Sequence, residues 1–167
     1  MSSATGAGIA PESIDSPAAL ALIAELDDYL GALYPPEENF LALAAGDVRP
    51  GNGLFLVARL ADEPVACGAV RLLSPTTAEI KRMYVRPVAR GLGLARGLLQ
   101  ALEQEARALG ARRAVLETGD RQPEALGLYR HSGYAPIPCF GEYAASPSSL
   151  CLEKQLQADA RGRRAPR

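Results

Sequence analysis

The sequence predicts one α/β domain with a mixed central sheet, in which an antiparallel meander precedes helix-crossed strands and helices flank the sheet. Three consecutive strand-like runs are separated only by short turns, which leave no room for crossover helices, so these strands pair antiparallel. Later strand-like runs alternate with helical segments, as in α/β layer folds. A chain of 167 residues, 48% of them apolar and 22% charged, suits a single domain, which we expect over residues 1–156.

After a loose start, the first predicted helix covers residues 15–33. Asp15 or Ser16 caps it and Pro17 occupies its first turn. The stretch "YPPEENFLALAAG" breaks this helix and allows a short second one that ends near Gly46. The residues that recur on one face of the first helix are Leu22, Leu26, Tyr29 and Leu33.

The meander follows, with turns at "ADEP" and "LSPTT". A helix is then predicted over residues 93–109, with Gly110 in the C′ position. A shorter helix starts near Pro123 and ends before Gly133. The predicted strands cover residues 53–60, 64–73, 77–85, 111–118, 134–137 and 148–154.

Charge is unevenly distributed, although the formal net charge is only −1 and gives no sign of nucleic-acid or membrane-surface binding. Residues 1–48 hold eight acidic residues and no Lys or Arg. These acids form either a solvated face on the first helices or an acidic arm over a basic, anion-binding body. The eight are Glu12, Asp15, Glu25, Asp27, Asp28, Glu37, Glu38 and Asp47.

The three cysteines, Cys67, Cys139 and Cys151, are odd in number and widely spaced, without a C-x-x-C pair. This usage indicates a reduced compartment and predicts neither a disulfide framework nor a metal site. The chain shows no positively charged signal segment and no apolar run of about 18 residues, so we expect a cytoplasmic protein without a membrane partner. Residues 157–167 hold four arginines and little to bury, which predicts a disordered basic tail.

Gly91, Gly93 and Gly97 stand at the start of a strongly apolar helix, where glycine costs roughly 1 kcal/mol relative to alanine. A glycine turn that opens a helix can hold phosphate, because the first N–H groups are unpaired and the helix dipole favours negative charge. Their spacing is a loose dinucleotide fingerprint, but that turn leaves directly from a buried apolar strand, whereas here the strand is charged and "RPVAR" intervenes. Alternatively, the small residues only allow close packing.

The spacing Arg90-x-x-Gly93-x-Ala95 resembles the acyl-coenzyme-A-binding motif of the GNAT superfamily of N-acetyltransferases, which reads Gln/Arg-x-x-Gly-x-Gly/Ala. Further blocks resemble one bacterial branch of that superfamily with largely unassigned substrates: "EIKRMYVRP", "RGLGLARGLL", "LETGDRQPEALGLYRHSGY", "FGEY" and "SLCLEK". The resemblance covers roughly residues 17–155. It implies a GNAT-type sheet and acetyl-CoA as co-substrate, and a homodimer is common in the superfamily.

The coenzyme contacts are expected at this motif and at the strand before it. Small residues let a pyrophosphate approach backbone N–H groups, and Arg86, Arg90 and Arg96 surround it with positive charge. The resemblance implies that N–H groups near a strand bulge hold the oxyanion and pair with the pantetheine arm. It also implies a contact from Gln122, where Asn is common. The expected set is Met83, Tyr84, Val85, Arg90, Gly91, Leu92, Gly93, Leu94, Ala95, Arg96 and Gln122.

Two residues are candidates for proton transfer. By resemblance, Tyr129 lies beside the coenzyme sulfur, and a phenol with a pKa near 10 suits donation to a thiolate; the alternative is a core tyrosine with a bonded hydroxyl. Glu79 precedes Arg90 by eleven positions, the offset of the glutamate base in histone-acetylating members. Its alternatives are a solvated acid at a strand end or an ion-pair partner of Lys81 or Arg82, with ordered water as the base. His131 is expected at the surface.

The acceptor is expected opposite the coenzyme, between residues 34–40 and the loop over residues 138–147. The acidic N-terminal segment favours a cationic acceptor, whereas Lys81 and Arg82 beside Glu79 favour one that bears a carboxylate. The candidate acceptor residues are Tyr34, Arg82, Glu117, Phe140 and Tyr143.

The expected activity is direct acetyl transfer from acetyl-CoA to the primary amine of a small molecule, amino-acid-like or polyamine-like. Three alternatives stay open: an acetyl-CoA-binding module without turnover, a protein or peptide N-acetyltransferase, and a nicotinamide oxidoreductase. The module predicts that Tyr129→Phe is harmless, and the oxidoreductase predicts stabilisation by NAD.

Overall fold

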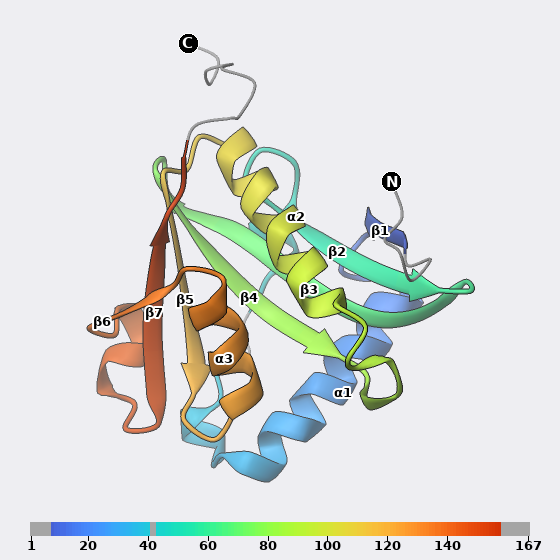
Figure 1. Cartoon of the computed structure of the whole chain (residues 1–167), viewed down its shortest axis with the longest axis horizontal. Coiled ribbons are helices and arrows are strands. Elements are labelled where there is room, and N and C mark those ends of the chain that lie inside the picture. Colours follow the sequence, from blue (N-terminus) through green and yellow to red (C-terminus); the bar gives the residue numbers. More distant parts are fainter. Residues whose placement is uncertain (1–7, 41–42, 158–167) are drawn as a thin grey trace.

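The computed structural model describes residues 8–40 and 43–157, which form a seven-stranded sheet with helices on both faces (Figure 1). The strand order is β1-β2-β3-β4-β5-β7-β6, and every neighbouring pair is antiparallel except β4 and β5. This confirms the predicted mixed sheet. The strands are β1 (Gly8–Pro11), β2 (Gly53–Leu60), β3 (Glu63–Ser74), β4 (Thr77–Val85), β5 (Arg113–Gly119), β6 (Ala135–Ile137) and β7 (Ser149–Gln155), and the helices are α1 (Pro17–Leu33), α2 (Leu94–Ala108) and α3 (Pro123–His131).

Helix α1 covers one face of the sheet. Ser16, one of the two predicted caps, accepts a hydrogen bond from the Ala19 N–H at 3.0 Å and so satisfies a free donor of the first turn. The buried face of α1 packs on β2 and β3, whose inward side chains are Phe55, Val57, Cys67 and Ala69. Tyr29, expected on this face, is 40% exposed and lines a pocket described below.

Helix α2 packs on the opposite face and, with α3, covers the larger apolar cluster. Gly110 follows α2 with a φ of 100°, as the C′ prediction requires. Gly97 in α2 has a packing role, because a Cβ there would lie 3.3 Å from the Ile9 side chain on β1. No helix of the described ranges is long and apolar enough to cross a membrane.

Two predicted features were wrong near the N-terminus. Strand β1 was missed, because four residues at a sheet edge give too short an alternation to detect. The expected second helix is replaced by two 3₁₀ turns, Pro36–Glu38 and Ala45–Val48, because consecutive prolines interrupt the helical pattern. Residues 41–42 lie outside the described part, as does the predicted tail beyond residue 157.

The prediction of no disulfide was also wrong, because Cys139 and Cys151 are bonded. The pairing of β6 with β7 places Ile137 opposite Cys151, which brings Cys139 close, with a Cα–Cα distance of 5.0 Å. Cys67 stays free and buried. The odd count misled the sequence argument, since strand pairing and not spacing joins these two residues.

The acidic N-terminal segment pairs with arginines of the sheet and matches neither predicted alternative fully. Four of its eight carboxylates form ion pairs with the strands or with the residue that follows β4. Half of the acidic residues are therefore neutralised where α1 and the segments on either side of it meet the sheet. The pairs are Glu12–Arg59, Glu25–Arg86, Asp27–Arg82 and Asp47–Arg71.

The central feature of the sheet is a fork between β4 and β5 (Figure 1). The two strands pair in parallel only as far as Ile80 and Leu116, and then separate. Just beyond this point β4 has a bulge, where the register with β3 shifts and Arg82 takes a φ of 60°. The fork leaves one edge of β4 without a strand partner and creates space through the sheet.

Candidate active site

Two pockets meet at the fork. The larger, of about 420 Å³, lies between the end of β4, the loop before α2 and the start of α3. The smaller, of about 100 Å³, is bounded by the end of α1, β4, β5 and the chain before β7. Both are lined by Met83, Gln122 and Tyr129, with Leu26 and Ala125. Molecules bound in the two pockets can therefore touch near these residues.

The larger pocket contains the start of α2. Gly91 and Gly93 have φ values of 82° and 80°, and a Cβ on either would meet open space, so the backbone conformation and not crowding requires glycine. The Gly97 N–H reaches the Gly93 carbonyl at 3.1 Å, which leaves the preceding N–H groups of the first turn unpaired within the helix. With no acidic residue in that turn, this end of α2 suits an anion.

The predicted coenzyme set maps onto this pocket with one exception. Ten of its eleven residues line the pocket, whereas Leu92 is 41% exposed and does not. The prediction that Arg86 lies near the pyrophosphate was wrong. Its guanidinium pairs with Glu25 and donates to the Pro64 carbonyl at 2.7 Å. Arg90 and Arg96 remain at the pocket. The ten are Met83, Tyr84, Val85, Arg90, Gly91, Gly93, Leu94, Ala95, Arg96 and Gln122.

Tyr129 on α3 borders both pockets and is only 6% exposed. Its hydroxyl has no hydrogen-bond partner among the described residues, unlike the bonded core tyrosine of the alternative interpretation. Burial raises the pKa of Tyr129 strongly, and the nearby charge of Glu117 raises it further. The phenol therefore keeps its proton at neutral pH and can donate it into the fork.

Glu79 is held tightly in the smaller pocket. It is 1% exposed, and Arg71 contacts its Oε1 through Nε at 3.0 Å and Nη2 at 2.9 Å. The Tyr143 hydroxyl donates to Oε2 at 2.6 Å. The ion-pair partner of Glu79 is Arg71 on the neighbouring strand β3, and not Lys81 or Arg82, which the sequence suggested.

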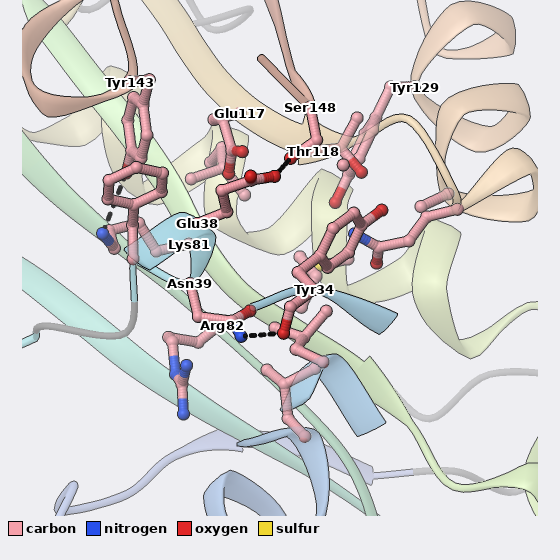
Figure 2. Close-up of a pocket in the computed structure, with 18 of the residues that line it drawn as sticks. Tyr34, Glu38, Asn39, Lys81, Arg82, Glu117, Thr118, Tyr129, Tyr143 and Ser148 are labelled. Atoms are coloured by element: carbon pink, nitrogen blue, oxygen red, sulfur yellow. Dashed lines mark hydrogen bonds between the residues drawn. The ribbon is translucent and has the colours of Figure 1, made fainter. Parts of the chain in front are cut away.

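Lys81 and Tyr143 form the side of this pocket that lies away from Tyr129 (Figure 2). Lys81 Nζ donates to the Tyr143 hydroxyl at 3.0 Å, and burial lowers the pKa of Lys81. The Tyr143 ring is packed edge-on by Phe40 and Phe140, with centroid distances of 5.1 and 5.2 Å. Phe140, a predicted acceptor residue, does not line the pocket and instead supports Tyr143.

Arg82 and Tyr34 serve mainly to join elements. The Arg82 guanidinium points away from the pocket centre (Figure 2) and binds Asp27 and the Ile23 carbonyl on α1. The Tyr34 hydroxyl accepts the Arg121 N–H at 2.8 Å, which fastens the end of α1 to the β5–α3 loop, and its ring still lines the pocket. His131 is exposed, as expected.

Glu117 and Glu38 are the other carboxylates of this pocket. Glu117 on β5 accepts a hydrogen bond from the Ser149 hydroxyl at 2.6 Å, and burial raises its pKa. Glu38, which the sequence argument did not select, accepts a bond from Ser148. Only its position within residues 34–40, the expected pocket wall, could have indicated it. Among the described residues, no group of three or more His, Cys, Asp or Glu side chains could hold a metal ion.

The forked sheet places a helix start that suits an anion in one pocket and ionisable groups in the adjoining one, an arrangement suited to group transfer from a phosphate-bearing donor. The profile of the acetyltransferase (GNAT) family matches residues 19–134. An IAA acetyltransferase of Azospirillum brasilense is 45% identical over 153 residues, which cover 89% of this chain and 97% of the relative. The chain belongs to the acetyltransferase (GNAT) family.

Solved structures agree with this assignment. A Klebsiella pneumoniae protein described as an acyl-CoA N-acyltransferase has a TM-score of 0.78 and 32% identity, with 90% of this chain and 98% of that chain covered. A GNAT acetyltransferase of Elizabethkingia anophelis, solved with acetyl-CoA, has a TM-score of 0.63 and 18% identity, with 90% and 99% covered. The protein is thus an acyl-CoA-dependent acetyltransferase with acetyl-CoA as co-substrate.

Proposed function

We propose that the protein transfers the acetyl group of acetyl-CoA directly to the primary amine of a small molecule, amino-acid-like or polyamine-like. The observation that carries this proposal is the meeting of the two pockets at Met83 and Tyr129. The volume of the acceptor pocket, about 100 Å³, favours a small acceptor. The name of the relative, IAA acetyltransferase, also points to a small molecule.

The larger pocket holds the coenzyme in this proposal. The pyrophosphate binds the N–H groups at the start of α2, with Arg90 and Arg96 beside it. The pantetheine arm runs along residues 83–85, where β4 lacks a partner strand beyond the fork. The same edge, next to the bulge at Arg82, supplies N–H groups to the oxyanion. Gln122, at the junction, contacts the arm.

The chemical step forms a bond from the acceptor nitrogen to the thioester carbon and breaks the carbon–sulfur bond. Tyr129 donates its hydroxyl proton to the departing thiolate. The acceptor ammonium must first lose a proton, and Glu117 is the carboxylate best arranged to take it, directly or through a water. Its pKa is raised, and its single side-chain hydrogen bond leaves acceptor sites free.

Glu79, expected as the base, has a different arrangement. Both of its oxygens are engaged, one by Arg71 and one by Tyr143, and it is nearly inaccessible. We assign it a positioning role, in which it fixes the Tyr143 hydroxyl at the pocket wall. The pH dependence of kcat/KM distinguishes Glu117 from Glu79 as the base.

Thiol release from acetyl-CoA, measured across amino acids, polyamines, aromatic amines and short peptides, tests the proposed acceptor class. The expected result is turnover of small amines, with the acetylated product identified by its mass. Peptides too large for the smaller pocket serve as the comparison. Turnover of peptides alone would contradict the proposal and support the protein or peptide alternative.

A further inference from the structure

Lys81 is a buried cation in the acceptor pocket without an anionic partner. It is 7% exposed and forms no ion pair with any residue in the described ranges. Its one side-chain hydrogen bond goes to the neutral hydroxyl of Tyr143. Burial of an ammonium group is costly unless an opposite charge accompanies it. The pocket is therefore arranged for an anion that a ligand supplies.

The nearby charged groups do not supply that anion. Glu79, two residues away on β4, is occupied by Arg71 and Tyr143, and Arg82 is bound to Asp27 outside the pocket. Burial lowers the pKa of Lys81, and the charges of Glu79 and Glu142 raise it, but neither carboxylate forms an ion pair with Lys81. Among the cations that line the smaller pocket, Lys81 is thus the one available to a ligand.

Two negatively charged side chains of the pocket lie nearer to Tyr129 than Lys81 does. Figure 2 shows Lys81 and Tyr143 on one side of the pocket and Tyr129 on the other, with Glu117 and Glu38 between them. The charge of Glu117 reaches Tyr129, since it raises the pKa of that phenol. The pocket therefore offers carboxylates toward the fork and an ammonium group away from it.

We propose that the acceptor is an amino carboxylate, such as an amino acid, whose carboxylate binds Lys81 Nζ while its amine lies between Glu117 and Tyr129. This inference rests on the proposed function and selects one of its two acceptor types. A polyamine would place a second ammonium group beside Lys81, where like charges repel at short distance. The carboxylate takes no part in the reaction, which forms the nitrogen–carbon bond and breaks the carbon–sulfur bond as above.

Kinetic comparison of matched acceptors tests this inference with the full-length protein. Each of several amino acids is compared with its primary carboxamide and with the amine that remains after removal of the carboxylate, and putrescine and spermidine represent the polyamines. Thiol release gives kcat/KM for each. We expect the carboxylate form to exceed its carboxamide by about tenfold or more, because a charge-assisted contact is lost in the amide.

Two substitutions locate the preference at Lys81. Lys81→Met keeps the apolar stem and removes the charge, so it should lower kcat/KM for the amino acids about tenfold or more, mainly through KM, with little change for the carboxamides. Lys81→Arg, which keeps the positive charge, should retain much of the preference for amino acids over their carboxamides. Arg112→Met removes an exposed cation outside both pockets and should leave the preference unchanged. Melting temperatures show whether each variant is folded.

The outcomes separate this inference from the proposed function. If carboxamides, decarboxylated amines or polyamines are the preferred substrates, the inference that the acceptor is an amino carboxylate is wrong. The proposed acetylation of small amines is then unaffected. An undiminished preference in folded Lys81→Met overturns the role of Lys81. Failure of every small amine overturns the proposed function and this inference together. The wild-type comparison of acid with amide stands even if a variant does not fold.

Discussion

Glu117 and Glu79 illustrate at the residue scale that sequence position does not report the surroundings of a carboxylate. The eleven-residue offset from Arg90 selected Glu79, and the structure surrounds that carboxylate with Arg71 and Tyr143. No sequence pattern shows that an arginine one strand away reaches it, because cross-strand pairing decides the contact. Tyr129 could be selected from its motif, and the structure places it at the junction of the pockets.

The pH dependence of kcat/KM distinguishes the two carboxylates. Burial raises the pKa of Glu117, and a base must be deprotonated, so the wild-type rate should fall as pH falls through this raised pKa. Glu117→Gln should lower the rate by about 10²–10⁴-fold and abolish this acidic limb. The measurement is a pH profile at subsaturating acceptor.

Glu79→Gln is the matched comparison for that profile. It should retain the acidic limb, since Glu117 is intact, although the loss of a charged partner for Arg71 lowers stability. If the limb disappears in Glu79→Gln and persists in Glu117→Gln, Glu79 is the base that the sequence predicted.

Most elements could be predicted from periodicity and turn residues, because the apolar patterns of α1, α2 and the meander agree with their tertiary positions. The fork between β4 and β5 gives no local signal, since it depends on where two strands cease to pair. The same limit applies to the Cys139–Cys151 disulfide and to Arg86, whose partner Glu25 lies on α1.

Substitutions at the start of α2 test the anion-binding turn. Gly91→Ala and Gly93→Ala force an L-residue into positive φ, which should cost about 1–2 kcal/mol and lower Tm by about 2–8 °C. Both should also weaken acetyl-CoA binding by shifting the N–H groups. Calorimetric unfolding and titration measure the two effects.

Gly127→Ala is the control for these variants. Gly127 lies inside α3, its φ is not positive and a Cβ there meets nothing within 4 Å, so alanine should be neutral or slightly stabilising. Unchanged acetyl-CoA affinity in Gly91→Ala and Gly93→Ala would show that the turn does not hold the pyrophosphate.

The whole molecule carries one covalent cross-link between the loop before Gly141 and β7. A bridge across a sequence separation of 12 should stabilise the fold by roughly 3 kcal/mol through the unfolded chain, and thiol reductants should lower Tm accordingly. Alkylation of the unfolded protein without reductant should modify only Cys67, giving one adduct by mass, against three after reduction. Three adducts without reductant would show that the bridge is absent.

The two pockets make one functional unit only if the hydroxyl at their junction takes part in the reaction. The most direct test is the rate of thiol release by Tyr129→Phe relative to wild type, at saturating acetyl-CoA and with the best small amine. We predict a loss of about 10²–10⁴-fold in kcat, with acetyl-CoA binding retained. An unchanged rate would contradict it, because Tyr129 would then be a packing residue and the thiolate would take its proton elsewhere.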